Sequence, residues 1–256
     1  MNGRFTGRVA VVTGSAQSIG LECATAFARE GAHAVLTDIN AEQAQAAAQS
    51  LREQNLSAIA FPLDVREPEQ IAALVQRVAE QFGQLDIWVN NAGLAHHYDS
   101  FDLPRELWQH SLDVMLSGPF FGSQAAGKYM RDHGGGAIVN MASVNAMVPQ
   151  PRRAAYCSAK AGVVMLTQVL ASEWAQYGIR VNAVAPSPVA TSGMAQAIDS
   201  VGITSLSQYT NRHPMKRMAA MQEVTEAVLF LASDQASFVT GETLCVDGGW
   251  VAYGYL

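Results

Sequence analysis

The sequence predicts a single α/β domain of the Rossmann type, with a doubly wound, mostly parallel sheet of about seven strands and helices on both faces. Short apolar runs alternate along the chain with longer segments whose apolar residues recur at helical spacing. The runs are nearly continuous in apolar residues, as expected of strands buried on both sides. The length of 256 residues suits one α/β domain. We therefore expect residues 1–256 to form one unit without a linker.

Each predicted element has its own local signal. In the first long helix after the second strand, Asn40 is placed as an N-cap with Gln43 as its capping-box partner. Pro68 stands in the first turn of a later helix. The predicted strands cover residues 8–12, 33–37, 57–63, 85–90, 137–141, 179–184 and 243–246. The predicted helices cover residues 19–29, 41–54, 67–81, 104–131 and 154–176.

One long segment, residues 187–217, has no clear strand character. It mixes Gly, Ser and Pro with short apolar patches. Long connections of this kind in compact domains are often functional, so we expect a substrate loop or lid.

Composition narrows the class of protein. The chain is 49% hydrophobic and only 15% charged, which is too apolar for a disordered chain. Sixteen Lys and Arg against 22 Asp and Glu give 16 − 22 = −6, and this acidic balance argues against a nucleic-acid partner.

Cysteine usage and hydropathy indicate the compartment. Three cysteines without a CxxC spacing form neither a disulfide framework nor a zinc signature. The first apolar run has four residues, too few for an export signal, and we expect no membrane span. These observations favour a cytoplasmic protein.

A glycine-containing turn follows the first strand. The stretch TGSAQSIG ends at Gly20 and precedes a helical pattern. Such a turn presents backbone N–H groups and the positive end of a helix dipole to a pyrophosphate. The second strand leads to Asp38, 24 residues after Gly14. A carboxylate there accepts hydrogen bonds from a ribose and repels a 2′-phosphate, so it favours NAD over NADP.

Several motifs in order resemble the classical short-chain dehydrogenase/reductase family. TGSAQSIG is similar to the TGxxxGxG fingerprint, NNAG at 90–93 to the fourth-strand motif, and Tyr156 with Lys160 to YxxxK. The resemblance extends from residue 7 to the VDGG at 246–249. It implies a small-molecule substrate, a secondary alcohol or ketone that is oxidised or reduced with a nicotinamide cofactor, for which Asp38 favours NAD. It also implies a homotetramer formed through the helices at 104–131 and 154–176.

The resemblance also implies site residues. The catalytic triad is Ser143, Tyr156 and Lys160, with Asn145 beside the substrate. The residues expected to bind the cofactor, besides Tyr156 and Lys160, are Gly14, Gln17, Ser18, Ile19, Gly20, Asp38, Asp64, Val65, Asn91, Ala92, Gly93, Pro186, Ser187, Val189 and Thr191.

The triad also has a chemical rationale. Tyr156 and Lys160 stand at i and i+4, on one face of a helix, and Ser143 follows the fifth strand. A free tyrosine has a pKa near ~10, too high for a base at neutral pH. We expect the ammonium of Lys160 and the positive nicotinamide ring to favour the phenolate, which can then accept the proton of an alcohol.

Three positions depart from the family pattern. Ser18 replaces the second glycine of the fingerprint, Met115 replaces an asparagine that helps hold a proton-relay water, and Ser187 replaces the glycine of PG. Met115 cannot relay a proton, so either another group does so or turnover is slow.

The remaining polar candidates are weaker. His96 and His97 have no third ligand at metal spacing, so we expect no metal site. Arg152 and Arg153 could meet a polar or anionic substrate, but a solvated pair is the simpler interpretation. Asn145 and Gln150, with the two arginines, incline the interpretation towards a sugar, polyol or hydroxy acid.

Two other functions remain open. A 3-oxoacyl-thioester reductase usually needs NADPH, and Asp38 argues against it. A weakly catalytic NAD-binding sensor or scaffold is suggested by Ser18 and Met115, although the intact triad argues against it.

Overall fold

A computed structural model of the chain describes residues 3–94, 96–191 and 206–254. These residues form one parallel seven-stranded sheet in the order β3-β2-β1-β4-β5-β6-β7, which confirms the predicted fold class. The strands are β1 (Val9–Thr13), β2 (His33–Asp38), β3 (Ala58–Pro62), β4 (Ile87–Asn90), β5 (Gly136–Met141), β6 (Ile179–Pro186) and β7 (Thr243–Val246).

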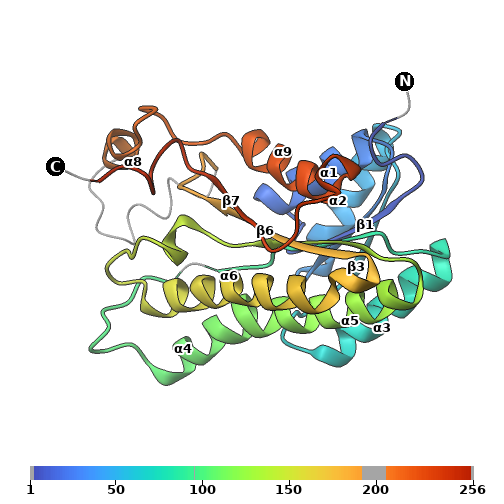
Figure 1. Ribbon diagram of the computed structural model, residues 1–256, viewed down its shortest axis with the longest axis horizontal. Helices are drawn as coiled ribbons and strands as arrows, with labels where there is room; N and C mark the ends of the chain where they lie inside the picture. The colour runs from blue at the N-terminus through green and yellow to red at the C-terminus, as the bar shows by residue number, and fades with distance from the viewer. Residues whose placement is uncertain (1–2, 95, 192–205, 255–256) are drawn as a thin grey trace.

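Helices cover both faces of the sheet (Figure 1). The helices α1 (Ser18–Arg29), α2 (Ala41–Glu53) and α9 (Met221–Ala232) lie on one face, and α3 (Pro68–Phe82), α5 (Gly118–Asp132) and α6 (Ala154–Trp174) lie on the other. Two shorter helices, α4 (Arg105–Leu112) and α8 (Leu206–Arg212), lie towards one end of the sheet.

The strands are buried on both sides because successive side chains enter different cores. In β1, Val9 and Val11 pack towards α3, whereas Ala10 and Val12 pack towards α1 and α9. All four side chains are fully buried. This explains why the strand sequences are apolar at nearly every position instead of alternating.

The strand order reverses between β1 and β4, which lie side by side in the middle of the sheet. The chain runs outward in one direction through β2 and β3 and in the other through β5, β6 and β7. Loops at the carboxyl ends of β1 and β4 therefore diverge, and the crevice between them is where open α/β sheets bind ligands.

The predicted long helix at 104–131 is interrupted. Between α4 and α5, residues Asp113–Ser117 form a π-helical turn, and Pro119 stands in the first turn of α5. Met115, in the middle of this turn, is fully buried. Single π turns inside α-helices are frequent at functional sites.

The start of α2 differs in detail from the predicted capping box. The side chain of Asn40 accepts a hydrogen bond from the backbone N–H of Gln43 at 3.1 Å, as predicted. The reciprocal bond, in which the Gln43 side chain would accept from the backbone N–H of Asn40, is absent, because that N–H donates to Oδ1 of Asp38 at 3.0 Å. The carboxylate of Asp38 is therefore tied to the start of α2.

Two helices were not anticipated from the sequence. α9 is signalled by buried Val224, Ala227, Val228 and Leu231, which recur at helical spacing. α8 lies inside the predicted substrate loop at 187–217. The middle of that loop, residues 192–205, lies outside the described residues.

No membrane span is expected from the sequence, but one helix among the described residues is long and apolar enough to cross a membrane when only length and composition are considered. Residues Ala154–Tyr177, which include α6, have a mean hydropathy of 1.3 over the most apolar window. The helix nevertheless buries Ala159, Val163 and Leu170 in the domain, and core helices pass the same test.

Candidate active site

A cavity of about 670 Å³ opens at the carboxyl ends of the strands. It is lined by loops that follow β1, β2, β3, β4, β5 and β6, and by the first turns of α1 and α6. Every site residue that the sequence nominates lines this one cavity: Gly14, Gln17, Ser18, Ile19, Gly20, Asp38, Asp64, Val65, Asn91, Ala92, Gly93, Ser143, Asn145, Tyr156, Lys160, Pro186, Ser187, Val189 and Thr191.

The glycines of the phosphate loop are required by close packing. Gly14 has a φ of +60°, and a Cβ there would lie 2.7 Å from Cα of Ala92. A Cβ on Gly20 would lie 2.2 Å from the carbonyl oxygen of Gly14. Both contacts are far shorter than van der Waals distance, so these positions accept only glycine.

The first turn of α1 faces the cavity with free donors. The N-cap residue Gln17 makes no side-chain capping bond to the helix, and Ser18 and Ile19 line the cavity. The first N–H groups of a helix have no partner within the helix and carry the positive end of its dipole. The loop therefore fits a pyrophosphate.

Ser18 adopts the left-handed conformation, with φ of +55°. Glycine enters this region without strain, whereas a residue with a Cβ is disfavoured there by about 1 kcal/mol. The side chain is exposed, so the serine strains the loop without filling it.

The fourth strand's motif is fastened to the phosphate loop. Nδ2 of Asn91 donates to the carbonyl oxygens of Thr13 and Gly14, each at 2.9 Å. The hydroxyl of Thr13 accepts from the backbone N–H groups of Asn91 and Ala92 at 3.0 and 3.1 Å. These bonds join β1 to β4 across the crevice and fix its floor.

At the end of the cavity beside the phosphate loop, Asp38 is the last residue of β2 and forms part of the cavity wall. Its Oδ2 accepts from the N–H of Ala16 at 3.2 Å. The one arginine that lines this end, among the described residues, is Arg66, and it forms an ion pair with Asp64. This pairing lowers the pKa of Asp64, so both groups are charged.

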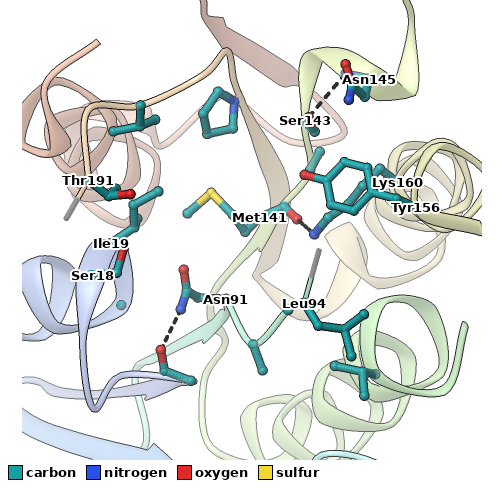
Figure 2. A pocket seen from close by; sticks show the side chains of 18 of the residues that line it. Ser18, Ile19, Asn91, Leu94, Met141, Ser143, Asn145, Tyr156, Lys160 and Thr191 are labelled. Carbon is teal, nitrogen blue, oxygen red and sulfur yellow. Dashed lines mark hydrogen bonds between the residues drawn. The ribbon is translucent and has the colours of Figure 1, made fainter. Parts of the chain in front are cut away.

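The catalytic candidates converge on the other side of the cavity (Figure 2). Tyr156 and Lys160 project from α6, and Ser143 stands directly after β5 as the N-cap of a short 3₁₀ turn. Nζ of Lys160 donates to the backbone oxygen of Met141 at 2.6 Å and lies 5.9 Å from the centre of the Tyr156 ring. The three side chains face Ser18, Ile19 and Thr191 across the cavity.

Burial shifts the pKa values of both Tyr156 and Lys160 towards the uncharged forms. It raises the pKa of Tyr156 above its usual value, although contact with Ser143 and the charge of Arg153 act in the opposite direction. Burial also lowers the pKa of Lys160 to about 8. The expected lowering of the Tyr156 pKa by Lys160 is therefore not seen in the protein alone, because desolvation of the phenolate is the larger effect.

A chain of polar side chains borders the space in front of Ser143. Nδ2 of Asn145 donates to Gln150 at 3.1 Å, and Nε2 of Gln150 donates to the hydroxyl of Tyr209 at 3.4 Å. All three line the cavity. Amide and hydroxyl groups of this kind can bind the hydroxyls of a polar substrate.

The departure at Ser187 has a structural partner. Its hydroxyl hydrogen-bonds Nε2 of His213 at 2.8 Å, and Nδ1 of His213 bonds the backbone oxygen of Tyr209 at 2.7 Å. His213 is fully buried and packs edge-on against Trp250, 4.8 Å between ring centres. Ser187 thus ties the end of α8 to the end of β6.

The paired arginines are not equally solvated, contrary to the simpler interpretation. Arg152 is exposed, whereas Arg153 is partly buried and lines the cavity. Nη2 of Arg153 lies 2.6 Å from Nε2 of His97. No cluster of three potential metal ligands occurs within the described parts of the chain.

Sequence reasoning did not identify four participants: Met141, Tyr209, His213 and the Arg153–His97 contact. Met141 acts through its backbone oxygen, which carries no residue signature. Tyr209 and His213 lie in the segment 187–217, whose sequence has no periodic pattern that predicts which of its residues reach the cavity. Only Arg153, three residues before Tyr156, had a signal in the sequence.

Comparisons with known proteins agree with this fold. A family model described as "Enoyl-(Acyl carrier protein) reductase" matches residues 14–251. D-threitol dehydrogenase of Mycolicibacterium smegmatis is 40% identical, over 96% of this chain and 94% of that protein. NAD-dependent glycerol dehydrogenase of Listeria innocua is 39% identical, over 96% and 94%. The structure of a gluconate 5-dehydrogenase from Burkholderia cenocepacia in complex with NADP and tartrate superimposes with a TM-score of 0.91, with 34% identity and 98% of each chain covered.

Proposed function

The chain belongs to the classical short-chain dehydrogenase/reductase family, and on that premise we propose that it is an NAD-dependent dehydrogenase of small polar hydroxy compounds with Tyr156 as acid/base. Its relatives are dehydrogenases of polyols and other alcohols, and the chain is an oxidoreductase that interconverts a secondary alcohol and a ketone. The finer points, NAD and the roles of individual residues, are argued below.

One observation carries the proposal. A single cavity brings Ser143, Tyr156 and Lys160 to one side and Asp38 with the phosphate loop to the other. A dinucleotide that spans the crevice between β1 and β4 would place its adenosine at Asp38 and its reactive ring beside Tyr156.

The residues support oxidation of an alcohol as follows. Ser143 and Tyr156 hold the substrate hydroxyl between them. Burial favours the protonated phenol in the protein alone, so the positive nicotinamide ring would be needed to favour the phenolate. Tyr156 would then accept the hydroxyl proton while the carbinol hydride leaves, and the C–O bond becomes a carbonyl. A nicotinamide held in this cavity would supply the acceptor for that hydride. Lys160, held by the backbone oxygen of Met141, supplies positive charge near the phenolate and a proton path at its Nζ.

Asp38 supports NAD over NADP. Its carboxylate is held by two backbone N–H groups, from Ala16 and Asn40, and would stand beside the 2′-position of an adenosine ribose. A 2′-phosphate there would meet a fixed negative charge. Arg66 is already paired with Asp64, so it offers little compensation.

Polar groups at the substrate end support a small hydroxylated substrate. Asn145, Gln150 and Tyr209 form the hydrogen-bonded chain in front of Ser143. The relatives that act on D-threitol and glycerol have substrates of this kind.

The test is absorbance at 340 nm with NAD or NADP and a panel of polyols, aldoses, hydroxy acids and secondary alcohols. We expect NADH formation with at least one polar substrate, and a loss of turnover of at least about 100-fold in Tyr156→Phe with NADH affinity retained, because general acid–base catalysis contributes about 10²–10⁴-fold. Tight NAD binding without turnover on any substrate would instead favour a sensor or scaffold. Turnover that persists in Tyr156→Phe would contradict the mechanism.

We further infer a homotetramer. α6 leaves a stripe of exposed small and apolar side chains, which includes Ala161, Met165 and Val169. Contiguous exposed apolar surface of this kind marks contact with another protein, and a second copy of α6 is the partner that the family resemblance implies.

All three cysteines are free, which supports the expected cytoplasmic location.

A further inference from the structure

Arg153 occupies an unusual place at the substrate end of the cavity. It is the residue immediately before α6, three positions before Tyr156, and it lines the cavity. Its guanidinium carbon lies 5.0 Å from the centre of the Tyr156 ring. A positive charge is therefore positioned within the span of a small substrate that is held by Tyr156.

This charge has no carboxylate partner among the described residues. The ion pairs there involve Arg4, Arg8, Arg66, Arg131 and Arg217. The carboxylates that line the cavity, Asp38 and Asp64, are at its adenosine end. Nε of Arg153 is buried and has no hydrogen-bond partner in the part of the chain that the structure describes. A partly buried cation without a counterion is costly, so such an arrangement indicates a ligand.

His97 orients Arg153 but does not neutralise it. Nε2 of His97 accepts from Nη2 of Arg153 at 2.6 Å. Burial and the nearby arginines lower the pKa of His97 to about 4, so the imidazole is neutral and remains an acceptor. The guanidinium therefore keeps its charge at the wall of the cavity, and one of its nitrogens is held by the histidine.

We propose that Arg153 binds a carboxylate of the substrate, so that the enzyme acts on hydroxy acids in preference to the corresponding neutral polyols. This inference rests on the proposed function and narrows its substrate class. The planar fork of a guanidinium matches a carboxylate geometrically. Asn145, Gln150 and Tyr209 would then bind the neutral hydroxyls of the same molecule.

A different role for Arg153 would act through Tyr156. As a nearby cation it could stabilise the phenolate without touching the substrate. Its removal would then lower kcat equally for acids and neutral polyols and move the pH profile. A carboxylate-binding role changes the selectivity between the two, mostly through KM. The two roles therefore give different results.

The experiment compares matched pairs that differ in one carboxylate: glycerate and glycerol, threonate and threitol, and gluconate and glucitol. We measure kcat/KM for wild type, Arg153→Gln, Arg153→Lys and the control Arg152→Gln, which removes an adjacent exposed charge. We expect wild type to prefer the acid in at least one pair by ten-fold or more. Arg153→Gln should lower that preference at least 30-fold, Arg153→Lys should restore part of it, and Arg152→Gln should change it less than three-fold.

A binding measurement makes the test independent of turnover. Tartrate should raise the unfolding temperature of the wild-type complex with NADH more than threitol does, and this difference should vanish in Arg153→Gln. If wild type oxidises neutral polyols as well as their acids and tartrate gives no greater shift than threitol, the inference is wrong while the proposed function stands. If no substrate is oxidised but the tartrate shift depends on Arg153, the proposed function fails and the anion site stands. An equal loss on both members of each pair, without the tartrate shift, would overturn the inference in favour of the phenolate role.

Discussion

At the scale of single residues, Asp38 connects the proposed preference for NAD to the local fold. Its two oxygens accept from the N–H groups of Ala16 and Asn40, at 3.2 and 3.0 Å. These bonds hold the carboxylate at the end of β2 and join the phosphate loop to the start of α2. The same side chain therefore stabilises the loop and, in the proposed function, would repel the 2′-phosphate of NADP.

Asp38→Asn separates these two roles, because an amide retains one acceptor oxygen and loses the charge. We expect kcat/KM with NAD to fall about ten-fold, and the preference for NAD over NADP to fall by at least that factor. Initial rates with both cofactors provide the measurement. Glu42→Gln, which removes an exposed charge in the first turn of α2, is the matched control. An unchanged preference in Asp38→Asn would exclude this carboxylate as the discriminating group.

Lys160 shows the energetic cost of placing an ammonium group in the proposed catalytic site. Its pKa of about 8 lies below the ordinary 10.5 because the ammonium is buried. Between these two values the unfolded chain binds a proton that the folded protein lacks, so this group's contribution to the free energy of unfolding increases with pH. Below about pH 8 the cost of burying the charge is present in full.

We therefore expect the stability of Lys160→Met, measured relative to wild type at the same pH, to be higher at pH 7 than at pH 9.5. The difference in unfolding free energy, variant minus wild type, should decrease by about 2 kcal/mol between these pH values. Urea denaturation of both proteins at each pH measures it, and titration of other groups cancels in the comparison. A difference that does not change with pH would show that Lys160 retains an ordinary pKa in the folded protein.

At the scale of elements, the π turn at Asp113–Ser117 determines what Met115 does. The turn forms without the family's asparagine, and the methionine is fully buried. Its Cγ would lie 3.9 Å from a Cβ placed on Gly93, an ordinary van der Waals contact, so it packs against the NNAG segment. Wide helical turns disturb the regular pattern of backbone hydrogen bonds, and a backbone carbonyl can hold a relay water whatever the side chain is.

From this we predict that Met115→Asn changes kcat less than two-fold. The variant should be less stable by about 1–3 kcal/mol, because it buries an amide in an apolar site. Steady-state rates and thermal unfolding give both quantities. A ten-fold rise in kcat would show instead that wild type lacks a relay that the asparagine side chain supplies.

At the scale of the whole molecule, α6 serves two surfaces at once. One face carries Tyr156 and Lys160 into the cavity, and the opposite face leaves Met165 59% exposed and Val169 43% exposed. A subunit interface on this stripe would support the catalytic helix from behind. Oligomerisation and activity are then coupled through a single element.

Met165→Glu tests this coupling. A charge in the centre of the proposed interface should dissociate the oligomer, because a carboxylate buried without a partner is strongly unfavourable. Light scattering after size exclusion should give about four times 27 kDa for wild type and a mass no larger than that of a dimer for the variant, because this stripe forms only one of the interfaces of a tetramer. Glu173→Gln, on an exposed part of the same helix, serves as the control. A wild-type protein that is already monomeric would contradict the proposal.

The sequence by itself determined the sheet and most of the site, because both depend on local patterns. Continuous apolar runs specified strands buried on both faces, and the positions just after those strands supplied the residues of the cavity, from Gly14 to Thr191. The left-handed turn and the close contact at Gly14 require glycine, so they are visible in the sequence.

What only the tertiary structure decided comes from groups that are distant in sequence. The pKa of Tyr156 depends on how deeply α6 buries it, and the partner of Lys160 is a backbone oxygen of β5. Ser187 has its role through His213, 26 residues later. Arg153, which had seemed a solvated charge beside Arg152, is held by His97, 56 residues earlier. Desolvation and hydrogen bonding between remote segments set the charge state and direction of each group, and neither is contained in the residue itself or in its neighbours along the chain.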